Sequence, residues 1–78
     1  MPIIGNLPLT FCRNVTWLRK RYYLSKRALA ALTGLSEHTI AYMEDCEQSP
    51  EMSFSILERL SGIFDVSVED LVHTDLRK

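Results

Sequence analysis

The chain has few of the residues from which small proteins build rigid chemical sites or membrane spans. Its 78 residues include two cysteines, three glycines and three prolines, and its longest clearly apolar run covers only residues 28–32. A membrane-spanning helix needs about 18 apolar residues. The first residues carry no basic charge and are interrupted by Pro2 and Pro8, so they resemble a signal peptide poorly. We therefore expect one small cytoplasmic domain without a membrane segment.

The spacing of the cysteines and histidines argues against a metal centre. Cys12, His38, Cys46 and His73 are isolated in the sequence and form none of the close pairs typical of zinc sites. Two isolated cysteines are more consistent with free thiols in a reducing compartment than with a disulfide between them. The glycines are too widely spaced for a phosphate-binding loop, and so short a chain leaves little room for a deep pocket. We expect no enzyme, no cofactor and no metal.

Charge is divided unevenly along the chain. Residues 1–35 contain six basic residues and no acidic one, whereas residues 36–78 contain ten acidic and three basic residues. This asymmetry is consistent with one face that binds a polyanion and another that is turned away from it. An ordinary mixed surface is the alternative, because the fold decides which charges share a face.

Turn and cap signals predict an extended segment over residues 1–11, a helical domain over 12–73 and a fraying tail over 74–78. Residues 3–9 are the one candidate strand. Phe11, Val15, Leu18 and Tyr22 recur at helical spacing, with Asn14 as the expected N-cap of this first helix. Ser53 and Ser67 are expected to begin a fourth and a fifth helix.

The middle of the chain predicts two short helices joined by a tight turn. Ser25 and Ser36 are expected N-caps, and Gly34 stands where a helix end requires a left-handed backbone. Leu29 and Leu32 are expected to lie on the buried side of the first of these helices. Such a helix-turn-helix can place its second helix in the major groove of DNA.

Two stretches carry a resemblance to a known family. They read N-V-T-W-L-R-K-R-Y-Y-L-S-K-R-A-L-A-A-L-T-G-L-S-E-H-T-I-A-Y-M-E-D-C-E-Q-S-P and L-E-R-L-S-G-I-F-D-V-S-V-E-D-L, and together they span about residues 14–72. Their order of motifs resembles the Cro/repressor-type helix-turn-helix family of phage and bacterial transcription regulators. The resemblance implies an all-α, five-helix, lambda-repressor-like DNA-binding domain. It also implies a homodimer on double-stranded DNA, with half-sites about one helical turn apart.

The resemblance also suggests roles for particular residues. It implies a structural pair of Arg19 with Glu44, which can equally be an ordinary ion pair without a role in DNA binding. Backbone phosphates are the expected partners of the basic residues Arg13, Lys26 and Arg27. Base edges are the expected partners of Glu37, His38, Thr39 and Tyr42 on the third helix. Each of these four can instead be an ordinary solvated or core-covering residue.

Departures from the family pattern motivate a second hypothesis. After Glu44 the chain reads D-C-E-Q-S-P, so Asp45 and Glu47 stand where relatives often carry basic residues, and Cys46 replaces a glycine. A net charge of −1 is also low for a nucleic-acid binder. The favoured function is a dimeric repressor that blocks an operator. The alternative is a protein-interaction module of the same fold, such as an antirepressor or an antitoxin-like partner.

Overall fold

The computed structural model describes residues 3–4, 7–45 and 52–77. In these ranges five helices follow one another: α1 (Leu9–Arg21), α2 (Lys26–Thr33), α3 (Glu37–Glu44), α4 (Phe54–Phe64) and α5 (Val68–His73). Two short strands, β1 (Ile3–Ile4) and β2 (Met52–Ser53), pair in antiparallel register, with Ile3 opposite Ser53. The fold is the predicted all-α arrangement of five helices.

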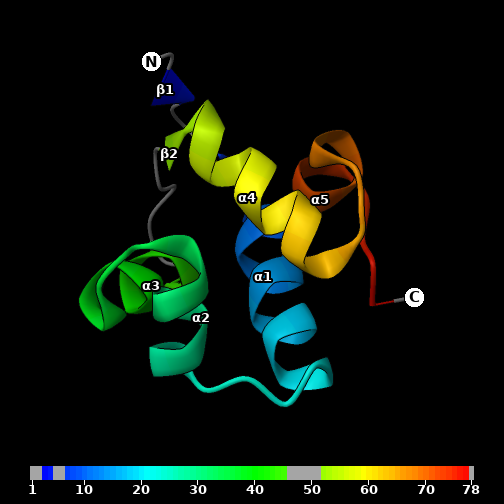
Figure 1. Ribbon diagram of the computed structural model, residues 1–78. Helices are drawn as coiled ribbons and strands as arrows, with labels where there is room; N and C mark the ends of the chain where they lie inside the picture. The colour runs from blue at the N-terminus through cyan, green and yellow to red at the C-terminus, as the bar shows by residue number, and fades with distance from the viewer. Residues whose placement is uncertain (1–2, 5–6, 46–51, 78) are drawn as a thin grey trace.

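Helix α1 lies at the centre of the fold (Figure 1). It packs against α3 on one side and α5 on the other, while α2 contacts both α3 and α4. Figure 1 shows α2 and α3 together on one flank of the molecule and α4 and α5 on another, with the strands at the end near the N-terminus. The helix-turn-helix pair α2–α3 therefore forms one flank of the fold and is packed against α1 and α4.

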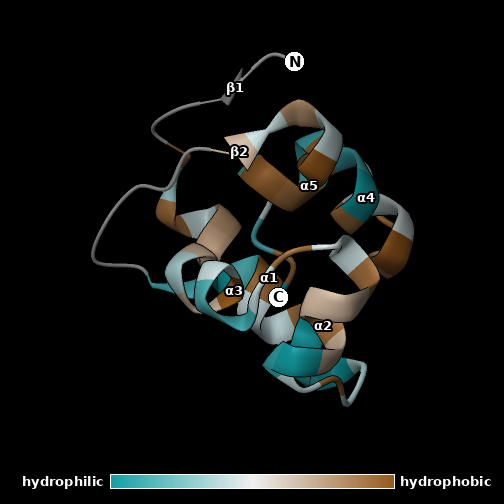
Figure 2. Ribbon diagram, turned by 60° about the vertical axis from the view of Figure 1, so that its left-hand side comes forward, coloured by the Kyte–Doolittle hydropathy of each residue, from teal (hydrophilic) through white to brown (hydrophobic). Residues whose placement is uncertain are grey.

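One hydrophobic core joins all five helices. On α1, Phe11, Val15 and Leu18 are buried, as their spacing predicts for one face of a helix. The other helices contribute further buried side chains: Leu29, Ile40, Met43, Leu57, Leu60, Phe64 and Leu71. In Figure 2 hydrophobic and hydrophilic turns alternate along the helices, as is expected of helices that bury one face.

The beginning of α1 differs from the prediction. The helix begins at Leu9, inside the segment expected to be extended, and its N-cap is Pro8, whose carbonyl accepts from the Phe11 N–H at 3.0 Å. Proline suits such a position because it has no N–H that would need a partner. Asn14 is thus not a cap: it lies within α1 and is 0% exposed.

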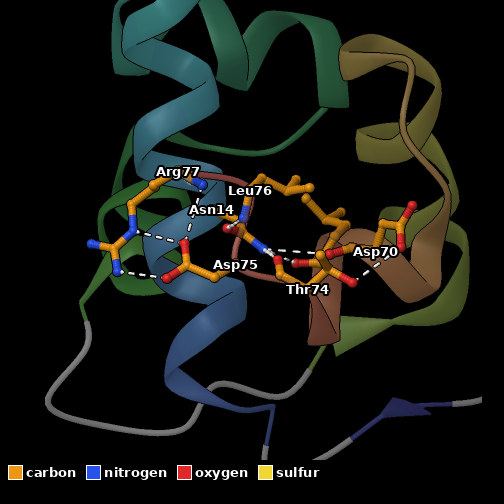
Figure 3. A network of polar contacts seen from close by, with 7 residues as sticks. Asn14, Asp70, Thr74, Asp75, Leu76 and Arg77 are labelled. Carbon is orange, nitrogen blue, oxygen red and sulfur yellow. Dashed lines mark hydrogen bonds and ion pairs between the residues drawn. The ribbon is translucent and has the colours of Figure 1, made fainter.

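The buried amide of Asn14 instead holds the C-terminal end of the chain (Figure 3). Its Nδ2 donates to the carbonyl oxygens of Leu71 at 2.8 Å and Thr74 at 2.6 Å, with a longer contact to Asp70 at 3.4 Å. Its Oδ1 accepts from the Leu76 N–H at 3.0 Å. The tail just after α5 is therefore fastened to α1 where we expected a fraying end.

Two further expectations need correction. Among the described residues of the predicted strand over residues 3–9, only Ile3–Ile4 form a strand, since Leu7 is a buried core residue outside any strand and Leu9 is helical. Leu32 is 56% exposed, and the buried residues of α2 are Leu29, Ala30 and Thr33. At 3.6 residues per turn, Leu32 points about 100° away from the middle of that buried face.

Candidate nucleic-acid interface

The turn between α2 and α3 is built around Gly34. This residue has φ of 76°, in the left-handed region, and its N–H and that of Leu35 both reach the carbonyl of Ala30. Arg59 of α4 donates from Nη1 to the Thr33 carbonyl at 2.8 Å. Because glycine adopts this conformation at little cost, the chain can end α2 sharply and begin α3 within three residues. The predicted helix-turn-helix is therefore present.

Serine side chains cap both helices of this unit. Ser25 accepts from the Ala28 N–H at 3.0 Å, and Ser36 accepts from the Thr39 N–H at 3.1 Å. The first turn of α2 contains no acidic residue. Lys26 and Arg27, which open α2, are exposed. They stand at the N-terminal end of α2, where the helix dipole favours an anion, and their contact with phosphate stays a prediction.

Helix α3 divides into a buried and a presented side. Ile40 and Met43 are 0% exposed and anchor the helix to the core. The predicted base-contacting residues Glu37 and His38 are exposed, and Tyr42 is 38% exposed. All three have side chains available to a groove. Their contact with DNA stays a prediction.

Thr39 is placed differently from these three residues. Its side chain is partly buried, and its hydroxyl lies 2.9 Å from the Ser36 hydroxyl. Part of its hydrogen-bonding capacity is therefore engaged within the cap of α3. Ala41 adds an exposed small residue to the presented side between His38 and Tyr42.

Arg19 and Glu44 form the ion pair that the resemblance implies. Nε and Nη2 of Arg19 donate to the two carboxylate oxygens of Glu44 at 2.7 and 3.1 Å, and the two side chains are 11% and 6% exposed. Nη1 donates to the Leu24 carbonyl at 2.9 Å. One buried guanidinium thus joins α1, the α1–α2 turn and the end of α3. A phosphate contact by Arg19 stays a prediction.

Arg13 lies apart from the other predicted phosphate contacts. It is exposed on α1 and lines an open hollow of about 320 Å³ with residues that include Trp17, Glu44 and Arg77. The structure therefore places Arg13 near the end of α3, while Lys26 and Arg27 stand at the start of α2. Cys46 and Glu47 of the predicted acidic loop fall outside the described residues, and Asp45 is exposed directly after α3.

Sequence reasoning missed an aromatic and basic surface at the end of α1. Trp17, Lys20, Arg21 and Tyr23 line an open hollow of about 600 Å³. The run R-K-R at residues 19–21 indicated basic residues at a helix end, but not that two aromatic residues lie beside them. In the described part of the chain, no group of three or more potential metal ligands comes together, and no helix is long and apolar enough to cross a membrane.

These features define a helix-turn-helix domain with an exposed second helix. Comparison with known proteins agrees: residues 17–75 match the Cro/C1-type HTH DNA-binding domain, and the chain belongs to this family. The match leaves out residues 1–16 and 76–78, and so it excludes α1 up to Thr16. Neither a curated protein nor a solved structure gives a significant match. The domain is of the kind found in DNA-binding regulators, a class that is not enzymatic.

Proposed function

We propose that this protein is a sequence-specific transcriptional regulator that binds operator DNA through α3, as a repressor and as a homodimer. The observation that carries the proposal is the two-sided character of α3. Its buried residues fix it to the core, while Glu37, His38 and Tyr42 remain exposed on the surface of the helix-turn-helix. Side chains of these types can hydrogen-bond to base edges in the major groove.

The start of α2 has the character of an anchor on the sugar-phosphate backbone. Lys26 and Arg27 add positive charge to the N-terminal end of a helix whose first turn is free of acid. Contacts to phosphate set the position of a protein on the duplex but do not discriminate sequence. Lys26 and Arg27 therefore position α3, and the presented residues of α3 select the sequence.

The proposed dimer is supported by the general geometry of helix-turn-helix recognition, and the proposed repressor role rests on the dimer. A single α3 covers only a few base pairs, and two half-sites about one helical turn apart supply the remaining specificity. A small dimer seated on an operator blocks other proteins by occupying the site. Sedimentation with and without duplex DNA would show two copies per operator; one copy per operator at saturation would exclude the dimer.

The primary test measures binding of the protein to duplex DNA by fluorescence anisotropy at a series of salt concentrations. The wild-type protein is expected to lose affinity steeply as salt rises. Lys26→Ala is expected to weaken binding to all sequences alike and to reduce the slope of log affinity against log salt by about one. His38→Ala is expected to change the preferred sequence, by about 1–3 kcal/mol of discrimination per base pair.

A matched control gives the same change in net charge as Lys26→Ala. Gly62→Glu adds one negative charge to α4, which carries none of the proposed DNA contacts, and a Cβ added at this exposed glycine meets nothing within 4 Å. It is expected to leave affinity within about twofold, because charges away from the interface are screened by salt. If Lys26→Ala and Gly62→Glu have the same effect, α2 does not contact phosphate.

One observation favours the alternative, a protein-interaction module with weak or no DNA binding. Asp45 is an exposed carboxylate immediately after α3 and would repel a phosphate that approached it. Failure to bind duplex DNA at about 0.05 M salt, together with a stable complex with a protein partner, would support this alternative over the first proposal.

A further inference from the structure

The last turn of α1 and the turn that follows it carry a surface not accounted for by the helix-turn-helix. Trp17, Lys20, Arg21 and Tyr23 line its open hollow, and none of these described lining residues is acidic. We refer to these four residues as the α1-end surface. Lys20, Arg21 and Tyr23 are exposed, and Trp17 is partly buried. The surface therefore offers two cations and a phenol to a ligand outside the domain.

Tyr23 is held in a conformation that is unfavourable for its residue type. Its φ is 56°, in the left-handed region, and its side chain is 95% exposed. A bulky residue costs free energy in this backbone conformation, and glycine or asparagine would adopt it more easily. Burial does not compensate the cost, since the ring contributes almost nothing to the core. The conformation serves the end of α1, because the Tyr23 and Leu24 N–H groups donate to the Lys20 and Arg19 carbonyls at 3.0 Å, and it leaves the Tyr23 ring pointing into solvent beside Lys20 and Arg21.

Trp17 and Arg21 are already arranged against each other. The Arg21 guanidinium lies over the Trp17 ring, 5.2 Å from its centroid. This cation–π contact restrains a long side chain that would otherwise be free, so less conformational entropy is lost when the guanidinium binds an anion. The same contact covers one face of the indole, which makes the surface a poor stacking platform for the bases of a single strand.

The α1-end surface continues directly into the proposed phosphate anchor at the start of α2. Five residue steps separate Arg21 from Lys26, so their Cα atoms are at most about 18 Å apart. A duplex carries one negative charge for about every 1.7 Å of its axis, so several phosphates fall within that distance. In Figure 2 the end of α1 and the start of α2 form one hydrophilic corner of the molecule.

We propose that the α1-end surface binds the sugar-phosphate backbone of duplex DNA next to the half-site read by α3, and so extends the footprint beyond the helix-turn-helix. The inference rests on the proposed function. Lys20 and Arg21 neutralise phosphates there, and the Tyr23 hydroxyl donates a hydrogen bond to a phosphate oxygen. These contacts add affinity and salt dependence without adding sequence preference.

The experiment measures salt-dependent binding to a duplex of about 30 base pairs, selected from a random pool by the wild-type protein. The variant Lys20→Gln/Arg21→Gln is expected to lower the salt slope by about two and to weaken binding at least about tenfold at 0.1 M salt, while preferring the same sequence. Tyr23→Phe is expected to weaken binding a few-fold and leave the slope unchanged, since it removes a donor and no charge. Unchanged urea midpoints would show that these variants fold.

The possible outcomes separate this inference from the proposed function. If Lys26→Ala reduces the slope but the double variant binds within twofold of wild type with an unchanged slope, the α1-end surface does not contact DNA and the helix-turn-helix proposal stands. If the wild-type protein shows no salt-dependent duplex binding, both proposals fail. If a glutamate-rich peptide displaces the α1-end surface from duplex as effectively as a competing duplex does, the surface is a site for acidic proteins and the inference is overturned.

Discussion

Replacing Asn14 by alanine tests how much the buried hydrogen bonds between α1 and the C-terminal segment contribute to stability. The side chain lies inside α1 and satisfies backbone groups near the opposite end of the chain (Figure 3). The substitution removes two short donor contacts, to Leu71 and Thr74, and one acceptor contact, to the Leu76 N–H. It leaves a small void, and it leaves these backbone groups, which lie at or near the core, without their hydrogen-bond partner.

The expected loss follows from the cost of those orphaned groups. A buried polar group left without its partner costs about 1–3 kcal/mol, and water can reach the groups nearer the surface. Of the three, the Leu71 carbonyl belongs to a residue that is 0% exposed, whereas Thr74 is exposed. We expect a total loss of about 3 kcal/mol. A domain of this size has a stability of about 4–12 kcal/mol, so the loss is a large fraction of the whole.

Urea unfolding followed by circular dichroism measures this loss. The matched control is Thr16→Ala, two positions along α1, which removes only a hydrogen bond from Thr16 to the Cys12 carbonyl four residues back and should cost less than about 1 kcal/mol. Truncation after His73 removes two of the partners of Asn14. The truncated Asn14→Ala variant should therefore lose less stability than the sum of the losses caused by the two changes made separately. A loss below about 1 kcal/mol for Asn14→Ala, or strict additivity with the truncation, would refute the proposed fastening.

Three other substitutions have expected outcomes in the same unfolding assay. Gly34→Val should lower stability by more than about 1 kcal/mol, because φ is positive and the new Cβ would approach Arg59 Nη1; an unchanged melting temperature would contradict it. Glu44→Ala should cost about 3 kcal/mol, because it leaves the Arg19 charge buried without its partner; a change under about 1 kcal/mol would show that the charge finds water. Tyr23→Asn should leave stability unchanged or raise it by up to about 1 kcal/mol, since it relieves backbone strain at an exposed position; a clear loss of stability would mean that the ring supports the fold.

The elements that could be predicted from the sequence are those with local signals. Ser25, Ser36 and Ser67 act as caps through bonds to an N–H three residues on, and that spacing is visible in the sequence. Gly34 is equally local, because the left-handed turn depends on its own missing side chain. At Ser53 the position of the helix start was predicted, but its hydroxyl contacts the Ser55 hydroxyl at 3.1 Å and caps no backbone N–H.

The features that could not be predicted depend on contacts between residues far apart in the sequence, or on a backbone conformation that is unfavourable for the residue that adopts it. Asn14 looks like a cap in the sequence, and only the packing of α1 against α5 shows that its partners are more than fifty residues away. Tyr23 gives no sign of a left-handed backbone, because tyrosine is among the residues least expected there. The Arg19–Glu44 pair was inferred from family resemblance; no local spacing rule joins residues 25 positions apart.

The Arg59 contact to the Thr33 carbonyl has a consequence for how the domain meets its target. Arg59 holds the turn between α2 and α3, while Arg19 holds the end of α3 through Glu44 and the turn before α2 through the Leu24 carbonyl. The two-helix unit is therefore fixed to the rest of the molecule at three points. Because α2 and α3 are already fixed in position, binding to DNA would restrict few of their conformational degrees of freedom. The domain is therefore expected to bind the double helix as a rigid body. For the proposed dimer, any adjustment to the spacing of two half-sites would then have to come from movement between subunits or from bending of the DNA itself.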